Sequence, residues 1–152
     1  MNIEKVHMKF NMEVKRSLYH RIASDFRANP LVTKIIPVLI QWAKDGKSDG
    51  TYGELNKLIG YENGFSGIGM YLGCIQDIID IINLNTKLDI PTLNCLVANK
   101  RTMLPSYGFE YVDESYGDMT EEEQRVFVDN LKLDAFEYPY WDEVLEIMHL
   151  KK

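Results

Sequence analysis

The chain has 152 residues, of which 17 are Lys or Arg and 23 are Asp or Glu, so its formal net charge is −6. A hydrophobic fraction of 45% with 26% charged residues is typical of a folded globular protein and excludes a disordered chain. No apolar run is long enough to span a membrane, and the first ten residues lack the apolar centre of a signal peptide, so we expect a cytoplasmic protein that does not enter a membrane. Two cysteines, Cys74 and Cys95, supply neither a disulfide framework nor a zinc site.

The charge is distributed unevenly along the chain. Residues 1–60 carry ten basic and six acidic side chains, a net charge of +4, whereas residues 105–150 carry two basic and thirteen acidic side chains, a net charge of −11. Such an acidic segment repels a phosphate backbone and attracts a basic surface. A general nucleic-acid-binding protein is therefore disfavoured. The length predicts a single domain over residues 1–152.

Two helices are predicted in the first third of the chain. Residues 12–28 place apolar side chains at every fourth position and carry basic residues on the other faces, which predicts an amphipathic helix. A second helix is predicted over residues 34–45. Pro37 would lie in its first turn, where the missing N–H is tolerated.

The next two predicted helices have the outline of a helix-turn-helix. Thr51 followed three residues later by Glu54 is a capping-box pattern, and it predicts a short helix over 51–59. A longer helix is predicted over 65–82. A short turn that contains glycine joins the two, as in helix-turn-helix units.

Two strands are predicted after these helices. Residues 92–98 are too apolar and too short for a surface helix, and residues 109–112 have a similar pattern. A helix-turn-helix followed by a strand pair indicates a winged-helix-like core over residues 51–112. The fold class predicted is therefore mostly α with a small antiparallel sheet (α+β), with extra N- and C-terminal helices.

The acidic C-terminal part, residues 113–152, is predicted to be helical. Thr120 and Glu123 form a second capping-box pattern, which predicts a helix over 120–131. A last helix is predicted over 139–150.

Short motifs between residues 51 and 110 follow one another in a recognisable order: Thr-Tyr-Gly-Glu-Leu at 51–55, Gly-Ile-Gly at 67–69, Ile-Pro at 90–91, Leu-Val at 96–97 and Tyr-Gly at 107–108. This stretch resembles the C-terminal domain of the alkylguanine–DNA alkyltransferases and of the catalytically inactive alkyltransferase-like proteins. The resemblance implies a winged-helix fold and DNA binding. It implies that Tyr52 occupies the position of the family tyrosine that helps to rotate a nucleotide, and the basic pair Lys100 and Arg101 lies at the tip of the predicted wing.

The chain departs from this family at its reactive motif. In the family, Pro-Cys-His-Arg follows the isoleucine, whereas Ile90-Pro91 is followed here by residues 92–94, and Cys95 has no adjacent histidine. A thiol needs a neighbouring base or positive charge to become a good nucleophile. We therefore expect no alkyl transfer by Cys95.

The acidic segment is also rich in aromatic residues, because nine of the seventeen in the chain lie within residues 107–141. Tyr and Trp are common anchors of protein interfaces, and carboxylates attract a basic partner. The alternative is that these rings pack in the core of this chain while the acids remain in solvent. The predicted partner-binding residues are Asp113, Glu114, Asp118, Glu121, Glu122, Glu123, Tyr116, Tyr140 and Trp141.

The sequence thus predicts a non-catalytic binding protein for a basic protein partner, such as an immunity protein, an antitoxin or a phage-type inhibitor of a nuclease. An alkyltransferase-like protein that binds DNA without catalysis, through Tyr52, Lys100 and Arg101, is the alternative. No catalytic residues, metal ligands or cofactor-binding motif are predicted, although an enzyme whose acids converge from distant positions is a third alternative.

Overall fold

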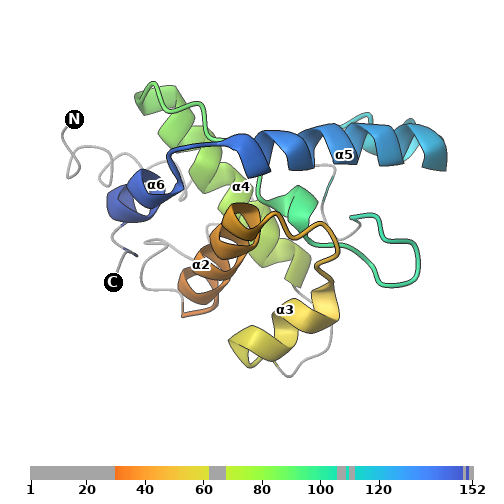
Figure 1. Ribbon diagram of the computed structural model, residues 1–152, viewed down its shortest axis with the longest axis horizontal. Helices are drawn as coiled ribbons and strands as arrows, with labels where there is room; N and C mark the ends of the chain where they lie inside the picture. The colour runs from red at the N-terminus through yellow and green to blue at the C-terminus, as the bar shows by residue number, and fades with distance from the viewer. Residues whose placement is uncertain (1–29, 62–67, 106–108, 110–111, 149, 151–152) are drawn as a thin grey trace.

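Figure 1 shows the computed structural model, in which residues 30–61, 68–105, 109, 112–148 and 150 are described. The α-helices within these residues are α2 (Pro30–Asp45), α3 (Tyr52–Ile59), α4 (Ile68–Asn85), α5 (Glu121–Glu137) and α6 (Trp141–Ile147). Two short 3₁₀ helices, η2 (Asn94–Leu96) and η4 (Tyr116–Asp118), lie between α4 and α5. The helix predicted over 12–28 lies outside the described residues.

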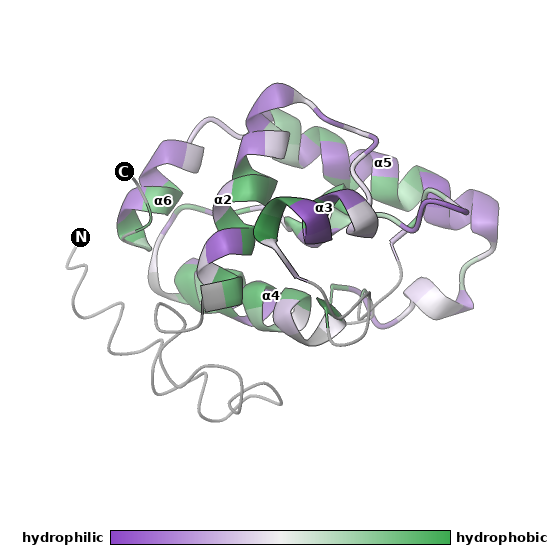
Figure 2. Ribbon diagram, turned by 90° about the horizontal axis from the view of Figure 1, so that it is seen from below, coloured by the Kyte–Doolittle hydropathy of each residue, from purple (hydrophilic) through white to green (hydrophobic). Residues whose placement is uncertain are grey.

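The core is built around α2 and α4. Ile75, Ile78 and Ile82 of α4 are fully buried, as are Ile35 and Leu39 of α2. Each such side chain stabilises the fold by roughly 1.5–3 kcal/mol through its removal from water. Because α2 packs against α3, α4, α5 and α6, it is the central helix of the molecule. Figure 2 shows that most of α4 is apolar, as a helix in this position requires.

Pro37 lies in the middle of α2 and not in its first turn, so the predicted start of this helix was wrong. The helix begins at Pro30, because a proline at the first helical position loses no intrahelical hydrogen bond. Pro37 has no N–H to donate to the carbonyl of Thr33. The helix continues through this position because Ile36 and Leu39 are buried on either side of it.

The helix α3 begins and ends at the caps that its sequence predicts. The hydroxyl of Thr51 accepts a hydrogen bond from the N–H of Glu54 at 3.2 Å. Gly60 follows the last residue with a φ of 73°, a left-handed conformation that favours glycine. The carboxylate of Glu54 pairs with Nζ of Lys47 at 3.1 Å and not with the N–H of Thr51, so this capping box is half formed.

The described residues contain no β-sheet, so the predicted antiparallel sheet and the winged-helix-like core were wrong. Residues 92–98 form a buried irregular segment that includes η2. Its polar groups bond to α4: the Asn94 amide donates to the carbonyl of Leu72 at 3.0 Å, and the Thr92 hydroxyl donates to Oε1 of Gln76 at 2.7 Å. A short apolar run fits any fully buried segment, so its pattern did not distinguish a strand from this arrangement.

The second predicted strand is also absent where the structure describes it. The carbonyl of Phe109 accepts hydrogen bonds from the N–H groups of Val112 (2.9 Å) and Asp113 (3.3 Å), which is a helical turn. Residues 106–108 and 110–111 lie outside the described residues. Extended pairing in the described part is confined to one isolated parallel bridge between Thr51 and Ala98.

Close packing at Gly50 joins the α2–α3 connection to the buried irregular segment. The N–H of Ala98 donates to the carbonyl of Gly50 at 3.0 Å. A Cβ atom at Gly50 would lie 2.6 Å from Cε3 of Trp42 and 2.8 Å from the carbonyl oxygen of Leu96. Only glycine fits there without a shift of the surrounding atoms.

The two C-terminal helices were predicted, but their bounds differ from those expected. The helix α5 starts after Thr120 as predicted, yet it continues to Glu137 and not to 131, because Lys132 and Ala135 are buried one turn further on. The helix α6 begins at Trp141, two residues after its predicted start at Pro139.

Candidate functional site

The first turn of α5 is held by a complete capping box. The Thr120 hydroxyl accepts from the N–H of Glu123 at 3.1 Å, and the Glu123 carboxylate accepts from the N–H of Thr120 at 3.0 Å. The hydrogen bond from the N–H of Thr120 lowers the pKa of Glu123 below its ordinary value, and the Thr120 hydroxyl has a smaller effect in the same direction. The Gln124 amide adds a bond to the carbonyl of Tyr116 at 2.9 Å, which ties the helix start to η4.

The opposite end of α5 is tied to the rest of the molecule. Nζ of Lys132, a buried residue, donates to the carbonyl of Ser48 at 2.8 Å, and the Tyr138 hydroxyl donates to the carbonyl of Leu88 at 2.7 Å. In Figure 1, by contrast, the N-terminal turns of α5 extend to the right-hand end of the molecule, beyond α2 and α4. The helix therefore presents much of its length to solvent.

The exposed face of α5 is acidic. Its exposed acids are Glu121, Glu122, Glu123, Asp129, Asp134 and Glu137. Its exposed cation, Arg125, already pairs with Glu121 at 2.6 Å and donates to the carbonyl of Thr102 at 3.0 Å. No described residue forms an ion pair or a side-chain hydrogen bond with Glu122 or Asp129. These two carboxylates are available to a partner.

An apolar groove of about 450 Å³ lies beside the first turns of α5. Its lining residues are Met119, Glu122, Glu123, Val126, Phe127 and Asn130. Val126 is 59% exposed, and it is one of a few large apolar side chains in the described residues that are mostly in solvent. The groove thus has apolar walls and two carboxylates on its rim.

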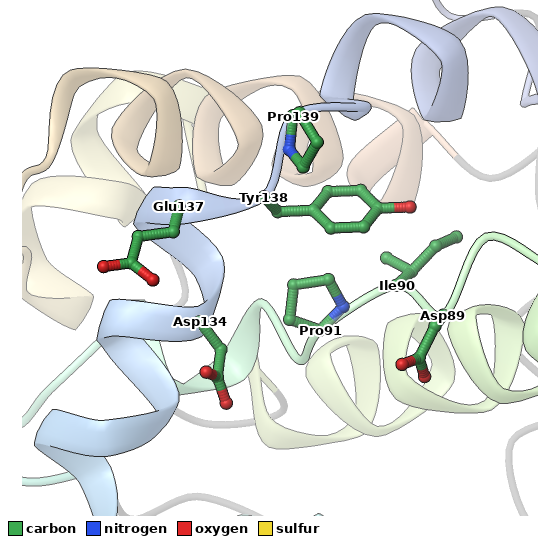
Figure 3. Close-up of a pocket in the computed structure, with 7 residues that line it drawn as sticks. All are labelled: Asp89, Ile90, Pro91, Asp134, Glu137, Tyr138 and Pro139. Carbon is green, nitrogen blue, oxygen red and sulfur yellow. The ribbon is translucent and has the colours of Figure 1, made fainter.

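A second hollow of about 440 Å³ lies at the C-terminal end of α5, and Figure 3 shows its seven lining residues. Asp134 and Glu137 come from α5 and Asp89 from the segment after α4, and all three are exposed. Pro91 lies between the acids in the view, with the ring of Tyr138 beside it. No described residue pairs with these three carboxylates, so the hollow is an uncompensated acidic pocket.

Tyr138 forms a fixed wall of this acidic pocket. Its ring meets those of Tyr140 and Trp141 edge to face, at 5.6 and 4.9 Å between centroids. Burial, with a smaller effect of Glu143 and Asp89, raises the pKa of Tyr138 to about 12. The phenol therefore remains protonated at neutral pH and keeps its hydrogen bond to Leu88.

The acidic residues predicted to bind a partner lie on the surface, but not all of them are free. Glu114, Asp118 and Glu122 are exposed. The Asp113 carboxylate accepts from both the hydroxyl (2.6 Å) and the N–H (2.8 Å) of Ser115, and these two bonds lower its pKa. Glu121 and Glu123 are used by Arg125 and by the helix cap, as described above.

Of the three aromatic residues predicted to anchor a partner, one is exposed and two are buried. Tyr140 is 46% exposed, whereas Tyr116 and Trp141 are 5% and 2% exposed. Tyr116 packs against Phe109 at 4.6 Å between ring centroids, and Nε1 of Trp141 donates to the carbonyl of Ala135 at 2.8 Å. Tyr116 and Trp141 therefore belong to the core, and Tyr140 alone of the three presents its ring to solvent.

The residues of the nucleic-acid alternative do not form a joint surface. Tyr52 is 3% exposed and packs in the core, so its ring does not reach a nucleotide in this conformation. Lys100 and Arg101 are exposed in a turn, where the N–H of Arg101 donates to Oδ1 of Asn99 at 2.9 Å. The wing on which they were expected does not form in the described residues.

Both cysteines are buried and poorly suited to nucleophilic chemistry. Burial raises the pKa of Cys95 to about 12, and its thiol donates to the carbonyl of Thr92 at 3.5 Å. Burial, with a contribution of Asp77, also raises the pKa of Cys74 to about 12. Neither thiol provides a significant thiolate fraction at neutral pH.

The acidic pocket and the apolar groove were not identified from the sequence. Asp89 lies 45 residues before Asp134, and no sequence spacing brings the two together. Val126 was a signal that could have been used, because an aliphatic residue among Glu and Asp on an amphipathic helix is out of place on the solvent face.

No group of three or more His, Cys, Asp or Glu side chains in the described part of the chain is placed to hold a metal ion. Nor does a helix of that part combine the length and the apolar character needed to cross a membrane. Comparison with protein-family models, with curated proteins and with solved structures finds no match for this chain.

Proposed function

We propose that this protein is a non-catalytic binding protein that engages a basic protein partner through its acidic C-terminal part. An inhibitor of a basic nuclease, such as an immunity protein or an antitoxin, is the form of this function that we favour. The proposal rests on the α5 surface, where Glu122 and Asp129 are exposed and no described residue compensates their charge.

The charge of this surface would act before contact as well as in the complex. Residues 113–148 contain twelve acids and two bases, Arg125 and Lys132. Lys132 is buried and Arg125 is paired, so neither reduces the attraction for an approaching cationic protein by much. Fields of this kind accelerate association with a partner of opposite charge and weaken as salt is added.

The acidic pocket gives the partner a place for a basic side chain. Asp134 and Glu137 lie on one side and Asp89 on the other, with Pro91 and Tyr138 as apolar walls. A guanidinium or ammonium group suits such a setting, because carboxylates pair with its charge while the flat walls contact its stem.

The nucleic-acid alternative has less support. An electrophoretic mobility shift at low salt, with intact and mismatched duplexes, tests it directly. Retention that depends on Lys100 and Arg101 would favour the alternative over our proposal.

The test of the proposal begins with capture of partners from a cell extract on the full-length protein, followed by measurement of the affinity of each purified partner. The triple variant Glu114→Gln, Asp118→Asn, Glu122→Gln removes three exposed charges that bond to no described residue. We expect it to weaken the binding of a basic partner by at least about tenfold at low salt, and to weaken it less at high salt.

A matched control removes three charges elsewhere. Asp45, Asp49 and Glu54 lie around the α2–α3 connection, where Asp49 and Glu54 pair with Lys47. The triple variant Asp45→Asn, Asp49→Asn, Glu54→Gln has the same net charge as the test variant, and we expect it to bind like the wild type. Equal losses in both variants, or an acidic partner, would contradict the proposal.

A further inference from the structure

The apolar groove beside α5 suits one kind of contact in particular. We infer that it accepts a large apolar side chain of the basic partner, carried on a segment in which Lys or Arg flank that side chain. This inference rests on the proposed function and adds to it the position and the chemistry of the anchor.

The groove has a fixed apolar floor. Phe127 is partly buried, and its ring lies 6.5 Å from that of Phe109 and 6.4 Å from that of Tyr116, between centroids. Tyr116 is held in turn by its hydroxyl, which donates to the carbonyl of Pro105 at 3.0 Å. An anchor side chain therefore meets a preformed surface, which reduces the ordering cost of binding.

One wall of the groove is exposed apolar surface. Val126 is 59% exposed in this wall, and Met119, which also lines the groove, packs against the core. An apolar side chain that covers Val126 removes its own surface and that of Val126 from water. Well-packed anchors of this kind carry most of the binding energy in protein interfaces.

The rim of the groove determines the charge of the segment that carries the anchor. Glu122 and Glu123 line the rim, and Asp129 is exposed nearly two turns further along α5. Glu122 and Asp129 have no described cation, so basic side chains beside the anchor would pair with them. An acidic or neutral segment would leave the same carboxylates without compensation.

The charge also argues against two other occupants. A second copy of this chain would bring its own acids onto Glu122 and Asp129, in either orientation of two α5 helices, since Asp134 and Glu137 make the other end acidic as well. A phospholipid surface presents anionic groups to the same carboxylates. A basic segment of another protein is the occupant that complements the rim.

The experiment uses the full-length protein and three designed helical peptides that carry a fluorescent label. The first has leucines on one face and lysines beside them, the second has alanine in place of leucine, and the third has glutamate in place of lysine. Fluorescence anisotropy measures the affinity of each. We expect the leucine–lysine peptide to bind about tenfold more tightly than the alanine–lysine peptide, and the glutamate peptide not to bind.

Two variants on the same helix locate the anchor. Val126 lines the groove, whereas Leu133 is 53% exposed seven residues further on and does not line it. We expect Val126→Gln to weaken the leucine–lysine peptide about tenfold and to leave the alanine–lysine peptide unchanged. Leu133→Gln should change neither affinity. Circular dichroism confirms that both variants fold, and Glu122→Gln, which leaves the walls intact, should reduce the binding of both lysine peptides.

The outcomes separate this inference from the proposed function. Equal binding of the two lysine peptides, unchanged by Val126→Gln, overturns the groove and leaves the acidic surface as the binding site. Failure of both lysine peptides to bind overturns both proposals. A wild-type dimer that Val126→Gln dissociates identifies a second copy as the occupant. Tighter peptide binding after Lys15, Arg16, Arg21 and Arg27 are changed to Glu identifies the basic segment 12–28 of this chain, and either result overturns the inference.

Discussion

The helices α4 and α5 have nearly the same length but differ in how much of their surface is exposed to solvent. Among the described side chains of the 18-residue α4, only Asp80 and Leu84 are exposed, whereas ten of the 17 residues of α5 are exposed and three are buried. The residues of α4 are thus accounted for by the core. Most residues of α5 have no such role, which leaves them available for contact with another molecule.

This difference indicates which helix of the described part is the better place to look for a binding surface. Apart from Leu84 near its C-terminal end, which is 85% exposed, the described apolar residues of α4 are buried or partly buried, so they report on folding. In α5, Val126 is apolar and 59% exposed on the same helix as Glu122 and Asp129, and burial in the core does not account for its position.

The largest expected loss of stability comes from truncating a buried side chain of α4. Ile78→Ala removes a fully buried side chain of α4, and we expect a loss of about 2–5 kcal/mol in the free energy of unfolding. Leu133→Ala on α5 should change it by less than about 0.5 kcal/mol, because Leu133 is mostly in solvent. Urea unfolding of both variants provides the measurement, and similar losses would contradict the distinction.

Gly50 tests how closely the core region is packed. Gly50→Ala would push a methyl group onto Trp42 and the carbonyl of Leu96, and we expect a loss of about 1–3 kcal/mol in thermal or urea unfolding. Gly117 lies in η4, where an added Cβ meets no atom within 4 Å. Gly117→Ala is the control, and it should remain within about 0.5 kcal/mol of the wild type.

The N-cap threonines of α3 and α5 should contribute unequally to stability. Thr120→Ala removes a complete capping box from a helix with few buried residues, and we expect a loss of about 1 kcal/mol. Thr51→Ala removes one hydrogen bond from α3, which Leu55 and Ile59 hold in the core, so the loss should be smaller. The reverse order in urea unfolding would show that α5 does not depend on its cap.

The smallest effect concerns pH. Because the folded state lowers the pKa of Glu123 below its ordinary value of 4.5, its stabilising contribution is present above that value and disappears as the pH falls through the lower, folded-state pKa. Glu123→Gln should therefore lower the melting temperature slightly above about pH 5, and the difference from the wild type should vanish at more acidic pH. A difference independent of pH would exclude the carboxylate as its cause.

Local chemistry made much of the helical framework predictable. Thr51 and Thr120 marked the starts of α3 and α5 correctly because a cap depends on the residues nearest to it in sequence. Pro37 misled because it was expected in the first turn of its helix, whereas α2 already begins at Pro30. The end of α5 misled because it depends on tertiary contacts, such as the hydrogen bond of Lys132 to the carbonyl of Ser48.

The conformation of segment 92–98 and the layout of the candidate site depend on tertiary contacts that one sequence does not reveal. The apolar residues of 92–98 predicted a strand incorrectly, because the polar groups of this segment bond to Gln76 and Leu72 on α4 and not to a neighbouring strand. The acids of the C-terminal part were predicted to be exposed. Which of them are already engaged, as Glu121 is with Arg125, depends on distances that spacing alone does not give.

The bonds that hold the C-terminal helices join residues far apart in the sequence, and this has a consequence for folding kinetics. Lys132 is 84 residues from Ser48, and Lys44 pairs with Asp142, 98 residues away, at 2.7 Å. Closing loops of this length costs more chain entropy than joining helices that are neighbours in the sequence, and contacts of this kind slow folding. We therefore expect α5 and α6 to dock last and to open first, so that their amide hydrogens exchange with solvent deuterium faster than those of α4.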